Sequence, residues 1–220
     1  MWGSTPVDNY CERLDAGLFA EPLNALTNLG FLLSAWLVWR LAAGRVAPAG
    51  RVRLLAVLIA IVGLGSGLFH TFANTLTLWL DIVPILLFQL VFLWLYFRDV
   101  AGMRRTFAAI VLAVFLAAGL GAELVPSVLH GSLVYAPAIV VLAVLGIYHY
   151  RRRLAEPALL LVAAGVFLLS LVFRTADAEL CAYVPIGTHF LWHLLNAVVL
   201  YLVSRAYATN AGVAGPPIAP

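Results

Sequence analysis

The 220-residue sequence contains no lysine and has few charged residues of any kind. Charged residues make up 10% of the chain and hydrophobic residues 64%, and the mean hydropathy is +1.03. A water-soluble domain of this length needs more polar surface, so this composition excludes one and indicates an integral membrane protein. The net charge of +3 does not point to nucleic-acid binding, because most arginines fall in short loops between apolar segments.

The sequence also lacks the basic-then-apolar start of a cleavable signal peptide. Residues 1–22 are polar and acidic, so the first apolar segment must itself direct membrane insertion. We expect an extracytoplasmic N-terminal segment over 1–22 and a membrane domain over 23–205. Residues 206–220 are rich in small residues, proline and glycine, and we expect them to form a disordered cytoplasmic tail.

Seven apolar segments are long enough to cross a bilayer, since about 20 residues suffice. Short gaps separate these segments, and backbone groups inside a membrane must be satisfied within each helix. The sequence therefore predicts an all-α fold, a bundle of seven transmembrane helices. The predicted spans are 23–43, 53–73, 75–97, 105–122, 131–149, 157–174 and 185–204.

The arginines predict the orientation of this bundle. Eleven of the thirteen lie in loops on one side, and the opposite side carries Arg13 and Arg174. Because the arginine-rich side of a membrane protein faces the cytoplasm, the N-terminus is expected outside and the C-terminus inside. In a bacterium this would be a multi-pass protein of the inner membrane. The arginines of the rich side are Arg40, Arg45, Arg51, Arg53, Arg98, Arg104, Arg105, Arg151, Arg152, Arg153 and Arg205.

The sequence has only two cysteines, and both fall on the predicted outer side. Cys11 precedes the first span and Cys181 lies in the last external loop. A periplasmic or lumenal compartment permits disulfides. We therefore predict a Cys11–Cys181 bridge that ties the N-terminal segment to the mouth of the last span; the alternative is two unrelated free thiols.

Five polar residues interrupt the apolar spans. Ser66 and His70 lie four apart in the second span, Asp81 lies early in the third, and His189 and His193 lie four apart in the seventh. Residues four apart share a helix face. An ionisable group costs roughly 2.5–3.5 kcal/mol at the centre of a membrane helix, so such residues indicate function. The predicted topology places all five in the half of the membrane near the outer leaflet.

These residue types fit a catalytic zinc site. His189 and His193 would offer two ligands from one helix and His70 a third, which leaves the fourth position open for water. Asp81 would act as general base or would orient a ligand histidine. Ser66 would donate a hydrogen bond to a developing oxyanion. The plainer alternative is that such residues only pack or hydrogen-bond neighbouring helices.

Several motifs together resemble the alkaline ceramidase family, which belongs to a superfamily of seven-helix membrane hydrolases that includes the adiponectin-type receptors. The N-terminal segment resembles that of the same family, so the resemblance covers nearly the whole chain. The motifs within the spans are Gly65-Ser66-x-x-x-His70, Asp81-x-x-Pro84 and His189-x-x-x-His193-x-x-Asn196, and those before and within the first span are Tyr10-Cys11-Glu12 and Glu21-x-x-Asn24-x-x-Thr27-Asn28.

The resemblance implies that His70, His189 and His193 bind Zn²⁺, that Asp81 activates water and that Ser66 assists at the carbonyl. It implies hydrolysis of the amide of N-acyl sphingoid bases to a fatty acid and an amine. The partner would then be a membrane lipid, ceramide or another N-acyl lipid with the same bond. No nucleic acid and no obligate protein partner are implied.

Animal members of that family also carry a Ca²⁺ site in the N-terminal segment, close to the zinc pocket. Here Asp8, Glu12 and Glu21 are the matching carboxylates, and hard oxygen ligands suit Ca²⁺. The pattern departs from the animal one, because Asn9 is an extra residue after Asp8 and Leu14 stands where the family has Asn. The alternative is that these acids only solvate an outer loop.

Other functions fit the sequence less well. A zinc-containing seven-helix receptor or sensor without turnover is the main alternative, although the short cytoplasmic loops disfavour it. A rhomboid-type serine protease needs Gly-x-Ser-Gly, but Leu64 occupies the first glycine position. A b-type cytochrome would use paired histidines as haem ligands and leave Asp81 and Ser66 without a role.

Overall fold

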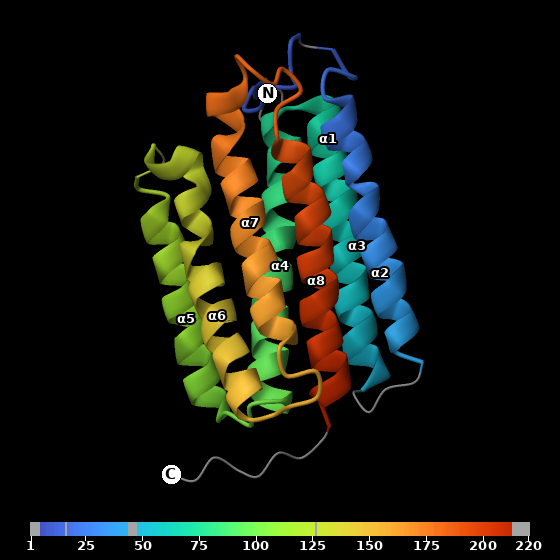
Figure 1. Cartoon of the computed structure of the whole chain (residues 1–220), viewed down its shortest axis with the longest axis vertical. Coiled ribbons are helices and arrows are strands. Elements are labelled where there is room, and N and C mark those ends of the chain that lie inside the picture. The colour runs from blue at the N-terminus through green and yellow to red at the C-terminus, as the bar shows by residue number, and fades with distance from the viewer. Residues whose placement is uncertain (1–4, 16, 44–47, 126, 213–220) are drawn as a thin grey trace.

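The computed structural model describes residues 5–15, 17–43, 48–125 and 127–212. The chain forms an all-α bundle in which the long helices run side by side along one axis (Figure 1). The N-terminal segment lies at one end of the bundle and the last turn of its final helix, at Asn210, lies at the other. We refer to the first of these as the N-terminal end.

Six helical segments are long and apolar enough to cross a membrane, and the chain is accordingly an integral, multi-pass membrane protein. Large apolar side chains such as Trp79 and Val114 lie exposed on their outer faces. The six segments are α3 (Ala49–Phe72), α4 (Thr75–Asp99), α5 (Arg105–Ala122), α6 (Ala136–Arg151) with the preceding 3₁₀ segment η1 (Val128–Tyr135), α7 (Leu159–Leu180) and α8 (His189–Asn210).

The first predicted span, 23–43, is divided into two helices, α1 (Pro22–Thr27) and α2 (Leu29–Leu41). The division falls at Asn28, whose side-chain amide donates to the carbonyl of Asn24 at 2.8 Å. Asparagine competes with the backbone for hydrogen bonds in this way, which weakens regular helix. The prediction of one continuous helix is therefore wrong, and the short α1 carries polar side chains toward the functional site.

The predicted tail also begins later than residue 206. Helix α8 continues to Asn210, and Ala206 and Tyr207 are fully buried. The Tyr207 hydroxyl donates to Asp99 Oδ2 at 2.6 Å, which ties the end of α8 to the end of α4. Tertiary packing thus extends the helix into the polar segment, while residues 213–220 lie outside the described residues.

Helices α3 and α4 approach closely where Gly65 faces Leu80. Pro84 has no N–H, so the carbonyl of Leu80 has no helical donor from position 84. A Cβ atom at position 65 would collide with that carbonyl oxygen, so glycine permits the contact. The close approach brings Ser66 beside Asp81.

Candidate metal centre

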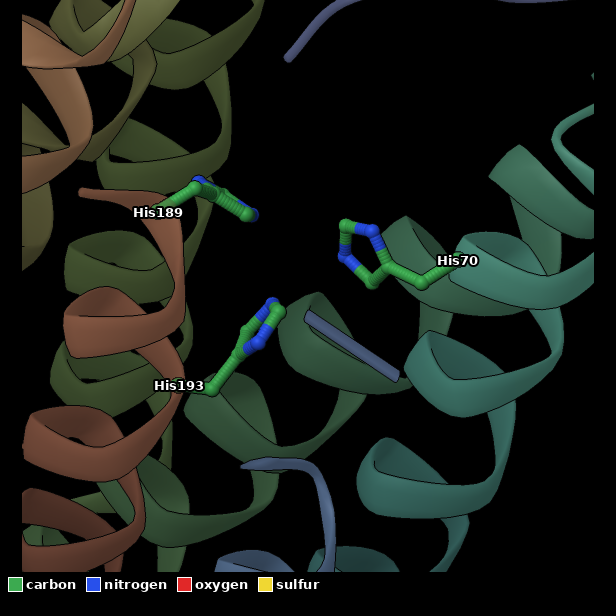
Figure 2. A group of neighbouring side chains, drawn as sticks. All are labelled: His70, His189 and His193. Carbon is green, nitrogen blue, oxygen red and sulfur yellow. The ribbon is translucent and has the colours of Figure 1, made fainter. Parts of the chain in front are cut away.

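Three histidines meet at the N-terminal end of the bundle. His70 comes from the last turns of α3, and His189 and His193 come from the first turns of α8 (Figure 2). One nitrogen from each ring lies within 4.8 Å of the others. Their exposed fractions are 0%, 2% and 2%, so the cluster is buried.

Two of the buried ring nitrogens have no hydrogen-bond partner among the described residues: His70 Nε2 and His189 Nδ1. Buried polar atoms are nearly always hydrogen-bonded, because an unpaired one costs about 1–3 kcal/mol. Three converging imidazoles, two of them with an unpaired nitrogen, fit the donor set of a transition-metal ion. The cluster could therefore hold a metal, as the sequence indicates.

Two of the histidines are held from behind by residues of the N-terminal part of the chain. His70 Nδ1 lies 2.6 Å from Glu21 Oε2, and His193 Nδ1 lies 3.0 Å from the Thr27 hydroxyl. A donor–acceptor contact at Nδ1 fixes the ring and turns Nε2 toward the centre, which is how proteins orient metal-ligating histidines. The carboxylate that orients His70 is thus Glu21 rather than Asp81.

Glu21 is a buried carboxylate with three polar neighbours. Its Oε1 accepts a hydrogen bond from Arg13 Nε at 2.6 Å, and its Oε2 also accepts one from Asn24 Nδ2 at 3.2 Å. Burial alone would raise the pKa of Glu21, but the contacts with His70, Arg13 and Asn24 outweigh it and lower the pKa below the usual value. Glu21 is therefore ionised at neutral pH.

Asp81 and Ser66 lie beside the histidine cluster. Ser66 lies close to the Asp81 carboxylate, and Asp81 lies close enough to His70 and Arg174 for their charges to interact. Ser66 is buried. The five polar residues that the sequence places in three separate spans therefore lie at one site.

A lid of N-terminal residues covers this site. The Tyr10 ring stacks on His189 with ring centroids 3.7 Å apart. The next residue, Cys11, lies at disulfide distance from Cys181, with Cα atoms 5.1 Å apart. Buried Asp177 accepts from the N–H groups of Cys11 and His189, at 3.1 Å and 2.9 Å. The start of α8 and the lid are thus fixed together.

The carboxylates predicted for calcium do not form a comparable cluster. Asp8 is exposed. Glu12 accepts from the N–H groups of Leu23 and Asn24 at 2.6 Å and 2.8 Å, which satisfies the start of α1. Among the described residues, the three histidines form the one group with converging ligand atoms. The structure gives no support to a calcium site here.

Arg174 is a site residue that the sequence pattern does not single out. Its guanidinium lies 5.3 Å from the ring centre of Tyr135 and 5.7 Å from that of Trp192, the residue before His193. It also donates to Ser132 Oγ at 2.7 Å. In the sequence, only the position of Arg174 distinguishes it, because it is the only arginine that falls within the outer half of a predicted span.

The model of a family described as Ceramidase matches residues 5–210, which include every site residue above. No curated protein matches the chain in a sequence comparison.

Proposed function

The chain belongs to the Ceramidase family, and from this premise we propose that it is a zinc-dependent lipid amidase that acts within the membrane. Membership implies an amidase, a hydrolase of linear amides, with a ceramide-like lipid as substrate. The proposal adds the metal, the residue roles and the products, a fatty acid and a sphingoid or related amine.

The observation that carries the proposal is the buried cluster of His70, His189 and His193 with its unpartnered nitrogens. Three neutral imidazoles with an open fourth position are typical of catalytic zinc. Zinc held there would supply a Lewis acid and make water acidic enough to lose a proton near neutral pH.

Asp81 and Ser66 are placed to handle the proton and the carbonyl oxygen. Asp81 takes a proton from the attacking water and delivers it to the amide nitrogen as the C–N bond breaks. Ser66 donates its hydroxyl hydrogen to the carbonyl oxygen as negative charge develops there. Ser66 lies beside Asp81, and once the carboxylate has taken the proton from water it no longer draws the Ser66 hydrogen, which is then free for the carbonyl oxygen.

An apolar cavity beside the histidines suits the hydrocarbon part of such a substrate. It reaches from Trp192 and Asn196, which flank His193 on α8, to Phe31 and Phe88 on the neighbouring helices. Its lining is almost entirely apolar, as binding of an acyl chain requires. A chain held there would place its amide near the metal cluster.

The histidines lie in the last turns of α3 and the first turns of α8, at the N-terminal end of the bundle (Figure 1), and the loops from α4 to α5 and from α6 to α7, which carry arginines, lie at the other end. By the positive-inside rule, the active site would be in the outer-leaflet half of the membrane. The lipid would then reach it from the outer leaflet.

The test combines metal analysis with an assay of fatty-acid release from a panel of N-acyl lipids. We expect stoichiometric zinc and hydrolysis in the wild type, and neither in His189→Ala. Asp81→Asn is expected to keep zinc and lose about 10²–10⁴-fold in kcat, because it removes the general base. His130→Ala is the control, since His130 is an exposed histidine outside the cluster.

Two outcomes would contradict the proposal. Wild-type protein that carries zinc but releases no fatty acid from any lipid would favour the receptor or sensor alternative. Wild-type protein that binds no zinc would show that the three histidines do not form a zinc site.

A further inference from the structure

Arg13 is a buried cation beside the metal cluster, in the segment where the family resemblance implies calcium. Its side chain is 7% exposed and that of its partner Glu21 is 1% exposed. Buried arginines require partners, because an uncompensated buried charge is costly. The groups that surround Arg13 must therefore neutralise and solvate its charge, and they show which kind of cation this part of the chain binds.

The contacts of Arg13 are those of a cation in an oxygen-lined site. Its Nε donates to Glu21 Oε1 at 2.6 Å, and the rest of the guanidinium approaches three backbone carbonyls. These carbonyls belong to Asp15 at 3.3 Å, Gly17 at 3.5 Å and His70 at 3.5 Å. A carboxylate and main-chain carbonyls are also the ligands that Ca²⁺ takes in proteins.

The other positions of the animal calcium pattern are not arranged as ligands. Leu14, which stands where that pattern has Asn, is 83% exposed. Asp8 is exposed, and both Glu12 oxygens accept from the start of α1. The residues present do not fit a calcium ion, since Ca²⁺ needs six to eight oxygen ligands.

Arg13 connects to the metal cluster through Glu21. The carboxylate lies between the guanidinium and His70, with Oε1 on Arg13 and Oε2 on His70 Nδ1 at 2.6 Å. The guanidinium also reaches the carbonyl of His70 itself. Fixing Glu21 thus fixes the ring of His70 and the direction of its unpaired Nε2.

We propose that Arg13 is a positioning residue that supplies within the chain the positive charge that calcium supplies in the animal members. Through Glu21 it holds His70 in the orientation that binds zinc, and metal binding needs no calcium. This inference rests on the zinc centre of the proposed function, but its test is made without substrate.

The experiment measures zinc affinity by chelator competition on purified full-length protein in calcium-free buffer. Arg13→Gln is expected to weaken zinc binding about 10–100-fold, the usual effect of losing a residue that orients a ligand. Arg13→Lys should restore part of the affinity, because it keeps the charge but not the planar fork. Arg205→Gln is the matched control, since it breaks the Arg205–Glu156 ion pair, which lies apart from the metal cluster.

A double variant separates positioning from general stability. Because Arg13 acts through Glu21, Arg13→Gln combined with Glu21→Gln should bind zinc no more weakly than Glu21→Gln alone. The double variant also leaves no unpaired buried charge of this pair, so it folds if the single variant does not. Millimolar Ca²⁺ should change neither the zinc affinity nor the melting temperature of the wild type.

Three results would overturn the inference: unchanged zinc affinity in Arg13→Gln, additive losses in the double variant, or tighter zinc binding by the wild type on addition of Ca²⁺. Normal zinc binding without lipid hydrolysis would overturn the proposed function and leave this inference standing.

Discussion

Single side chains behind the histidines decide how the metal site is oriented, and Thr27 allows a controlled test. Its hydroxyl lies 3.0 Å from His193 Nδ1 and also donates to the carbonyl of Leu23. Thr27→Val keeps the shape and removes the contact with the ring. We expect zinc affinity to fall about 10-fold, the lower end of the range for such residues, as measured by chelator competition.

Thr71→Val is the matched control for Thr27→Val. The Thr71 hydroxyl donates to the carbonyl of Gly67, four residues earlier, as that of Thr27 does to Leu23. Although Thr71 follows His70 in the chain, its hydroxyl has no hydrogen bond to a histidine ring among the described residues. Equal zinc affinities in the two variants would show that the Thr27–His193 contact does not orient the ligand.

At the residue scale, sequence reasoning found the residues whose type is costly in a membrane. His70, Asp81 and the pair on α8 stand out because hydrocarbon disfavours them. Arg13 does not stand out, because an arginine among acids before the first span is typical of a solvated loop. Only the folded chain shows its side chain buried against Glu21.

At the scale of the helix, the contact between α3 and α4 sets the position of Ser66 against Asp81. A Cβ at position 65 would collide with the Leu80 carbonyl, which belongs to the backbone and cannot move aside cheaply. We expect Gly65→Ala to destabilise the protein by about 1–3 kcal/mol, the usual cost of overpacking. Fatty-acid release should also fall, because Ser66 and Asp81 are pushed apart.

Gly67→Ala is the control for Gly65→Ala, measured by thermal unfolding and by the same lipid assay. The nearest atom to a Cβ at position 67 is 3.9 Å away, which is ordinary contact. Alanine there should be neutral or stabilise α3, since alanine favours helix by up to about 1 kcal/mol over glycine. If Gly65→Ala and Gly67→Ala have the same stability and the same fatty-acid release, then the close approach of α3 and α4 does not require glycine at position 65.

The helices themselves were partly predictable. Arg105–Ala122 was predicted to the residue, because a uniformly apolar segment that begins at a pair of arginines and ends before Glu123 has clear ends. The break at Asn28 was not predicted, since the mean hydropathy of 23–43 hides the effect of one asparagine side chain on the local backbone. The end of α8 was missed because burial of Tyr207 depends on Asp99, which is distant in sequence.

At the scale of the whole molecule, the orientation in the membrane stays a prediction from the arginines, and it decides which leaflet supplies the substrate. It can be tested with single cysteines, because Cys11 and Cys181 lie paired and would not react. Leu124 is strongly exposed beyond α5 at the N-terminal end of the bundle, and Gly50 has open space around it at the other.

A membrane-impermeant thiol reagent should label Leu124→Cys in intact spheroplasts. Gly50→Cys should react only after lysis, and unmodified protein should react in neither state. The reverse pattern would place the metal centre in the cytoplasmic half of the bilayer, and substrate supply from the outer leaflet would be wrong while the chemistry of the site would stand.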